Sequence, residues 1–181
     1  MLLESNPVEL NTNIIPFRLL GVDGRWYTPD DFCDRKILVI IFMCNHCPYV
    51  KAVIARFVRF QATYQNKGVQ LIGINPNDEI TYPEDSYDNM KKFYAEHKMN
   101  FPYLRDETQE IARAYDAVCT PDIYVYDIKR KLKYHGRFDD NWKDESKVTR
   151  KDFELAVERL LEGKEIDFKQ YPSMGCSIKW K

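Results

Sequence analysis

Two cysteines separated by two residues, Cys44 and Cys47, are the residues of this sequence with the most evident chemistry. A thiolate attacks a disulfide sulfur to form a mixed disulfide, and a second thiol nearby resolves it. We expect Cys44, at the tip of a helix, to be the exposed nucleophile with a lowered pKa. Cys47, one turn further in, is then the resolving thiol. His46 lies between them, where positive charge lowers the pKa of a thiol and makes the couple more oxidising.

The elements around the cysteines suit this chemistry. Residues 37–43 form an unbroken apolar, β-branched run, which is typical of a central strand covered on both faces. Apolar residues then recur from Val50 to Tyr64 at helical spacing, with Pro48 in the first turn, and residues 69–74 form a second apolar run. This β-α-β order predicts a parallel, right-handed unit. The positive end of its helix dipole favours a thiolate at the helix start.

The remaining elements follow from turn and capping signals. Asp23-Gly24 between apolar flanks predicts a hairpin, and Ser86 predicts the start of a helix that ends near Lys98. Asp106 and Gln109 form a capping box that predicts a helix over residues 107–115. Three further elements are expected. They are a hairpin of residues 123–126 and 131–136, a last helix starting at Thr149, and a tail, residues 164–181, without clear period.

The composition and the N-terminal sequence limit the partners and the location that we expect for this protein. The chain has 181 residues, 44% of them apolar, and a net charge of −1, which gives no reason to expect nucleic acid or a membrane surface as partner. We predict a lead-in of residues 1–15 followed by one domain over residues 16–181. The N-terminus has neither the basic region nor the apolar run of a secretory signal, so we expect a cytoplasmic protein. Five scattered cysteines argue against a disulfide framework.

A second constellation, Thr120-Pro121, precedes the strand of residues 123–126. Proline is allowed at a strand entry, and the sequence leaves open whether the bond is cis or trans. Cys176, in the tail, is either a third redox thiol that could pair with Cys33 or Cys119, or a packed small residue. A zinc site needs four ligands, and no second Cys-x-x-Cys pair exists, although Cys119, His135 or Cys176 could contribute. We predict no metal and no cofactor.

The order of these motifs resembles the thioredoxin-like fold, and more narrowly the redoxin branch that includes alkyl hydroperoxide reductase and thiol-specific antioxidant proteins. The resembling stretches are residues 44–52, 82–85, 101–106, 112–122 and 172–181. The resemblance implies an α/β fold with a central mixed sheet flanked by helices, an N-terminal hairpin and a helical insertion. It implies a thiol–disulfide oxidoreductase whose redox pair is Cys44 and Cys47, with Pro121 as the cis-proline beside it and Thr120 binding extended substrate through its backbone. The implied partners are protein or small-molecule disulfides and a dithiol or reductase as electron donor.

The sequence also departs from the thioredoxin pattern. Met43 replaces the usual tryptophan, Asn45-His46 replaces Gly-Pro, and the strand of residues 37–43 carries no acidic residue. The first alternative is therefore a peroxiredoxin-like peroxidase with Cys47 as the peroxide-attacking thiol and Cys44 in the place of the family's threonine. That family's nearby proline would fall at Ile40, and no arginine is evidently placed to stabilise a peroxide. The second alternative is a redox-inert or zinc-binding interaction domain.

Overall fold

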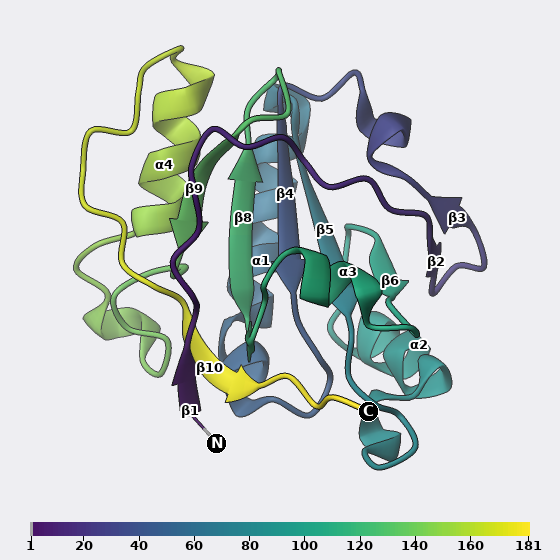
Figure 1. Cartoon of the computed structure of the whole chain (residues 1–181). Helices are drawn as coiled ribbons and strands as arrows, with labels where there is room; N and C mark the ends of the chain where they lie inside the picture. The colour runs from purple at the N-terminus through teal and green to yellow at the C-terminus, as the bar shows by residue number, and fades with distance from the viewer. Residues whose placement is uncertain (1) are drawn as a thin grey trace.

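The computed structural model describes residues 2–181 as a twisted mixed sheet covered by helices on both faces (Figure 1). Strand order is β3-β2-β6-β5-β4-β8-β9. The pairs β4–β5 and β5–β6 are parallel, and the other pairs of this sheet are antiparallel. The strands are β2 (Leu19–Gly21), β3 (Trp26–Tyr27), β4 (Ile37–Phe42), β5 (Val69–Asn75), β6 (Tyr103–Arg105), β8 (Asp122–Tyr126) and β9 (Leu132–Gly136).

Three helices cover one face of this sheet and one short helix lies against the other. Apolar residues of α1, α2 and α4 share a core cluster, whereas α3 packs in a second cluster with the segment around Phe17. The helices are α1 (Pro48–Tyr64), α2 (Tyr87–Glu96), α3 (Glu110–Ala114) and α4 (Asp152–Leu161). Four 3₁₀ helices complete the set, namely η1 (Pro29–Phe32), η2 (Gln65–Lys67), η3 (Pro83–Asp85) and η4 (Glu145–Lys147).

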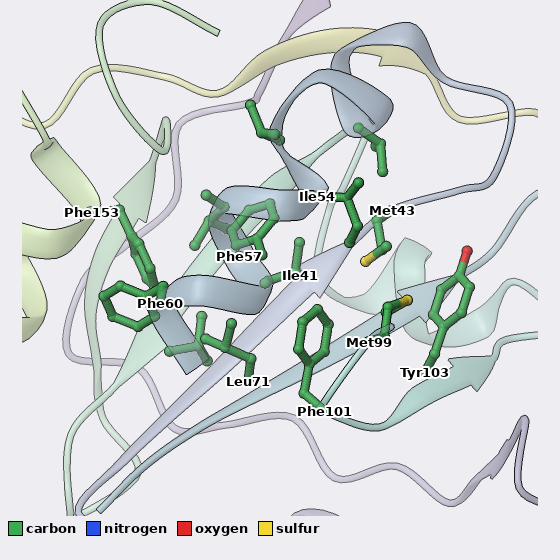
Figure 2. Close-up of a cluster of buried hydrophobic side chains, with 14 of the residues drawn as sticks. Ile41, Met43, Ile54, Phe57, Phe60, Leu71, Met99, Phe101, Tyr103 and Phe153 are labelled. Atoms are coloured by element: carbon green, nitrogen blue, oxygen red, sulfur yellow. The ribbon is translucent and has the colours of Figure 1, made fainter. Parts of the chain in front are cut away.

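β4 is the central strand that its apolar run predicts, and all six of its residues are buried. Because side chains alternate across a strand, Val39 and Ile41 face the α1 cluster while Leu38 and Ile40 face the other. Figure 2 shows Ile41 beneath Ile54 and Phe57 of α1. Burying each such side chain contributes about 1.5–3 kcal/mol, so this double-sided packing holds the end of β4 and the start of α1 in place.

Gln61 connects α1 to the first part of β5, which β6 does not pair with. β6 pairs with β5 only from Gly73 onward, which leaves the earlier part of the same edge without a strand neighbour. The buried Gln61 amide donates to the Val69 carbonyl at 3.2 Å and accepts from the Leu71 N–H at 2.7 Å. A side chain therefore replaces the missing strand there.

A second, three-stranded sheet joins distant parts of the chain. β10 (Met174–Ser177) lies between β1 (Leu2–Glu4) and β7 (Cys119–Thr120), antiparallel to both. Figure 1 shows β1 and β10 below the start of β8, on the side of the molecule where both ends of the chain lie. The lead-in and the tail thus meet in one sheet, which the sequence did not predict.

The mixed α/β architecture, the N-terminal hairpin and the β8–β9 hairpin are confirmed, but two helix starts were predicted wrongly. α3 begins at Glu110 because Gln109 takes a left-handed φ of 64°, while Asp106 accepts from the Ala112 N–H at 2.8 Å. α4 begins at Asp152 because the Thr149 side chain bonds to Asp140 instead of capping the helix. Over residues 2–181, none of the helices combines the length and the hydropathy needed to span a bilayer.

Candidate redox site

The two sulfurs lie where β4 passes into α1, and they are more enclosed than we expected. Cys47 is the N-cap residue of α1 and Cys44 precedes it in the connecting turn. The exposed fraction is 1% for Cys44 and 0% for Cys47. The prediction of an exposed Cys44 was therefore wrong: Cys44 belongs to the buried core cluster, against which residues of the tail also pack.

The environment favours the thiolate at Cys47 and the thiol at Cys44, which reverses the predicted order. A hydrogen bond from Cys44, followed by contacts with Thr120 and the backbone N–H groups of Val50 and Cys176, outweighs burial and lowers the pKa of Cys47 to about 5. The same Cys47 contact, burial and the Asp85 charge raise the pKa of Cys44. The prediction of a lowered Cys44 pKa was wrong, because the Cys47 contact, burial and the Asp85 charge all disfavour ionisation of Cys44.

Thr120 and Pro121 lie beside the sulfur pair. The peptide bond between them is cis, one of the two conformations that the sequence left open. The Cys44 sulfur lies 3.5 Å from the Thr120 hydroxyl, and either group can donate. The Cys47 sulfur lies 3.1 Å from the Thr120 carbonyl oxygen, to which it donates when it carries its proton. Both sulfurs are thus in contact with the residue predicted to bind substrate.

His46 contacts a carboxylate that sequence reasoning missed, and one nitrogen of its ring lies within 4.8 Å of the Cys44 sulfur. Its Nδ1 lies 2.6 Å from Asp85, whose side chain is fully buried, and the imidazole stacks on Tyr82. The Asp85 hydrogen bond raises the pKa of His46, and the Cys47 charge adds a smaller contribution. Burial opposes ionisation of Asp85, yet hydrogen bonds from His46 and Asn77 keep its pKa below the ordinary value.

Asp85 also holds the turn between the cysteines. It accepts from the backbone N–H groups of Asn45 at 2.7 Å and His46 at 3.3 Å. The Asn45 side chain is in turn fixed by Tyr103, which donates to it at 2.8 Å, and by the Glu84 carbonyl. Only the resemblance of residues 82–85 signalled this loop in advance.

The other cysteines occupy different environments. Cys176, on β10, packs against the cluster that contains Cys44 and Cys47. Cys119 is buried on β7, and burial raises its pKa well above the ordinary value. Cys33 is exposed after η1, before the start of β4. β4 has six residues, about 20 Å, so Cys33 lies at the opposite end of the strand from the sulfur pair.

One group of side chains offers a metal-ligand set. The candidate ligand atoms of Cys44, His46 and Asp85 lie within 4.8 Å of one another. Sulfur, nitrogen and oxygen together suit zinc, which takes four ligands in structural sites. In this structure Asp85 already accepts hydrogen bonds from both of its neighbours, Asn77 and His46. The sequence had suggested Cys119, His135 or Cys176 as zinc ligands; His135 instead pairs with Asp122 at 2.8 Å.

A cavity of about 180 Å³ opens beside Pro121. Its lining includes Tyr49 and Trp142, whose rings contact each other at 4.1 Å, and Met174 of β10. Arg137 also lines it, with its Nε donating to Asp152 at 2.7 Å. The cavity is thus mainly aromatic and apolar, next to the residues that contact the sulfurs.

The sheet order and the position of the sulfur pair at the start of α1 are those of a thioredoxin-like redoxin. Within this class the chain belongs to the AhpC/TSA family, whose model matches residues 10–135. No curated protein sequence matches the chain.

Solved structures share the fold of this chain. An uncharacterized conserved protein from Geobacillus kaustophilus is 46% identical, with a TM-score of 0.95, and the match covers 100% of this chain and 97% of the other. A hypothetical protein from Sinorhizobium meliloti is 37% identical, with a TM-score of 0.94 and 98% coverage of both chains. The thioredoxin domain of a thiol-disulfide oxidoreductase from Bacteroides vulgatus shares the fold at 16% identity, with a TM-score of 0.60 over 70% of this chain and 86% of that domain.

Proposed function

We propose that this protein is a thiol–disulfide oxidoreductase in which Cys44 and Cys47 alternate between dithiol and disulfide. The two sulfurs lie at the start of α1 and both contact Thr120, and this observation carries the proposal. The Cys47 thiolate attacks a substrate disulfide, forms a mixed disulfide and releases one substrate thiolate. Cys44 then attacks the Cys47 sulfur and releases the second substrate thiol, so two electrons pass from the protein to the substrate.

The substrates of this reaction are protein or small-molecule disulfides, and a dithiol or a reductase returns the electrons. Thr120 presents its backbone to an extended substrate, and the Tyr49–Trp142 cavity suits an apolar side chain next to the substrate cystine. His46 holds positive charge on the outer side of the pair, with Asp85 as its partner. A cytoplasmic location stays a prediction.

The test compares insulin reduction by dithiothreitol with and without the protein. We expect wild type and Cys33→Ser to accelerate insulin precipitation equally, because Cys33 lies outside the site. Cys47→Ser should fall to the rate of dithiothreitol alone, because the attacking thiolate is lost. Cys44→Ser should accumulate a mixed disulfide on Cys47. Full activity in Cys47→Ser would overturn the proposal.

Peroxide reduction is the second candidate, and one observation favours it. Cys47, the thiol with the lowered pKa, is the residue that the peroxiredoxin alternative assigns to peroxide attack. Against it, Cys44 occupies the place of the activating threonine, and Arg137, in the nearby cavity, is engaged with Asp152. Consumption of hydrogen peroxide by the reduced protein, without acceleration of insulin reduction, would favour the peroxidase.

A further inference from the structure

β10 pairs with the backbone edge of β7 at Thr120, which is the edge at which an extended substrate would pair. It runs antiparallel to β7 with Cys176 opposite Thr120 and Ser177 opposite Cys119. The approach is so close that a Cβ at Gly175 would collide with the Thr120 carbonyl oxygen. Only glycine allows the backbone of β10 to lie this near to the Thr120–Pro121 bond. The glycine at position 175 is therefore required for β10 to pair with β7.

The same strand presents Cys176 to Cys47. Cys176 stands opposite Thr120, whose carbonyl oxygen lies 3.1 Å from the Cys47 sulfur, and its side chain packs against the cluster that contains Cys47. Burial and the neighbouring Cys47 raise the pKa of Cys176 to about 11. In a substrate complex, the attacked cysteine would have to lie next to Cys47 on a strand beside Thr120. Cys176 meets both conditions within the chain.

Contacts on both sides of Cys176 hold β10 in this place. β1 pairs along its other edge, with Leu2 opposite Cys176. Beyond the strand, the Ile178 N–H donates to the Val118 carbonyl at 2.9 Å, and the Lys179 N–H donates to the Asn77 side chain at 2.9 Å. The tail thus rests over the redox site in an ordered, specific register.

From this register we propose that β10 is an internal substitute for substrate and that Cys176 is a third redox thiol, which forms a disulfide with Cys47. The inference rests on the proposed function, because it requires Cys47 to attack disulfides. β10 must leave the Thr120 edge when an extended substrate binds and return afterwards. Cys176 then competes with Cys44 for the mixed disulfide on Cys47.

The electrons balance along this route. With oxidised glutathione as the oxidant, Cys47 takes one glutathione sulfur and releases one glutathione thiolate. Bonding of Cys47 removes its negative charge, so Cys176 ionises more readily, attacks the Cys47 sulfur and releases the second glutathione thiolate. The proton of Cys176 passes to one glutathione, and the other glutathione thiolate takes its proton from water. Cys44 can then attack Cys47, which leaves a Cys44–Cys47 disulfide and returns Cys176 as a thiol without net oxidation.

The decisive experiment uses full-length Cys44→Ser, which prevents this last step. The reduced variant is treated with oxidised glutathione, digested with trypsin and mapped by mass spectrometry. We expect a crosslink between the peptides of residues 37–51 and 170–179. Cys33→Ser/Cys44→Ser, the matched control, should give the same crosslink, because Cys33 is remote from the site. Cys44→Ser/Cys176→Ser should instead stop at glutathione bound to Cys47.

The results distinguish failure of the Cys176 inference from failure of the proposed function. If Cys44→Ser carries glutathione on Cys47 without the crosslink, the role of Cys176 is overturned and the proposed function stands. If Cys47 takes up no glutathione in any variant, the proposed function itself fails. A crosslink that forms in Cys47→Ser but not in Cys44→Ser would make Cys44 the partner of Cys176 and overturn the inference as stated.

A second variant tests the position of β10 without altering any sulfur. Gly175→Ala places a methyl group against the Thr120 carbonyl, so β10 should separate from β7 more often. We expect iodoacetamide to alkylate Cys47 about tenfold faster than in wild type, since local opening exposes the thiolate. Gly163→Ala, beyond α4, is the control for backbone strain away from β10, because its φ of 70° disfavours alanine while nothing lies within 4 Å of the added Cβ. An unchanged rate in a folded Gly175→Ala protein would show that β10 does not limit access.

Discussion

At the scale of the residue, the chemistry depends on how one proton is shared between two sulfurs. Cys47 receives the hydrogen bonds and the positive end of α1, and Cys44 keeps its proton near the negative Asp85. Spacing alone predicts a redox pair, but it does not decide which thiol ionises, because that depends on groups supplied by other segments. Thr120 and Cys176 are two such contributors.

The first prediction concerns this ionisation. In reduced Cys33→Ser, thiolate absorbance at 240 nm should show its first step near pH 5, and this step should belong to Cys47. Cys33→Ser/Cys44→Ser should titrate at higher pH, because the hydrogen bond that stabilises the thiolate is lost. A first step at about 8.5, the free-cysteine value, would contradict the assignment.

The second prediction concerns His46 and Asp85. The pKa of His46 is raised, so its contribution to stability is complete below about 6.5, its unperturbed value, and is lost as pH rises through the folded value. The pKa of Asp85 is lowered, so its contribution is lost as pH falls through its folded value. An NMR titration of the His46 ring should show a midpoint above 6.5 that falls in Asp85→Asn. The same midpoint in both proteins would argue against the pair.

Asp85 marks the limit of prediction at this scale. It is 39 residues from His46, in a polar loop with no periodic pattern. Nothing in the spacing of either residue indicates that they meet. The cysteines, by contrast, are only three positions apart in the chain, and Thr120-Pro121 stands at the entry of a predicted strand. Contacts within one motif are therefore readable from sequence, and contacts supplied by a distant loop are not.

At the scale of the element, hydrophobic period predicts most of the strands and helices. β4 and α1 follow from an unbroken apolar run and a helical repeat. β1, β7 and β10 were missed because they have only two to four residues and pair across most of the chain. The start of α3 was missed because a left-handed residue, Gln109, interrupts an otherwise acceptable capping box.

The third prediction belongs to the connection of α1 with β5. Gln61→Leu should lower the free energy of unfolding by about 1–3 kcal/mol for each backbone group left unsatisfied, here the Val69 carbonyl and the Leu71 N–H. Gln65→Leu, at an exposed position one turn later, should change it by less than about 0.5 kcal/mol. Urea denaturation measures both. Equal effects of the two substitutions would mean that Gln61 does not serve as the missing strand neighbour.

At the scale of the whole molecule, a buried ion pair joins α1 to the segment between β9 and α4. Arg56 donates to Asp139 at 2.6 Å and to the carbonyls of Asn141 and Trp142, each at 3.0 Å. Trp142 reaches from this segment to Tyr49 and lines the cavity beside Pro121. The pair thereby supports the surface on which we expect substrate side chains to bind.

The fourth prediction follows from this pair. Arg56→Met should cost about 3–5 kcal/mol, because it leaves Asp139 buried without its partner. Arg59→Met removes an exposed arginine that pairs with Glu145, and it should cost at most about 1 kcal/mol. Thermal denaturation of the two variants compares them. A smaller loss for Arg56→Met than for Arg59→Met would show that Arg56 is not the central connection.

The carboxylate of Asp85 has one more consequence, for anions. Peptide N–H groups that point together just before a helix commonly attract sulfate or phosphate from solution. Here the amides of Asn45 and His46 already hold a negative group that the protein supplies itself. Free oxyanions such as phosphate should therefore not bind at this turn, and adding them should not change the reactivity of the two sulfurs.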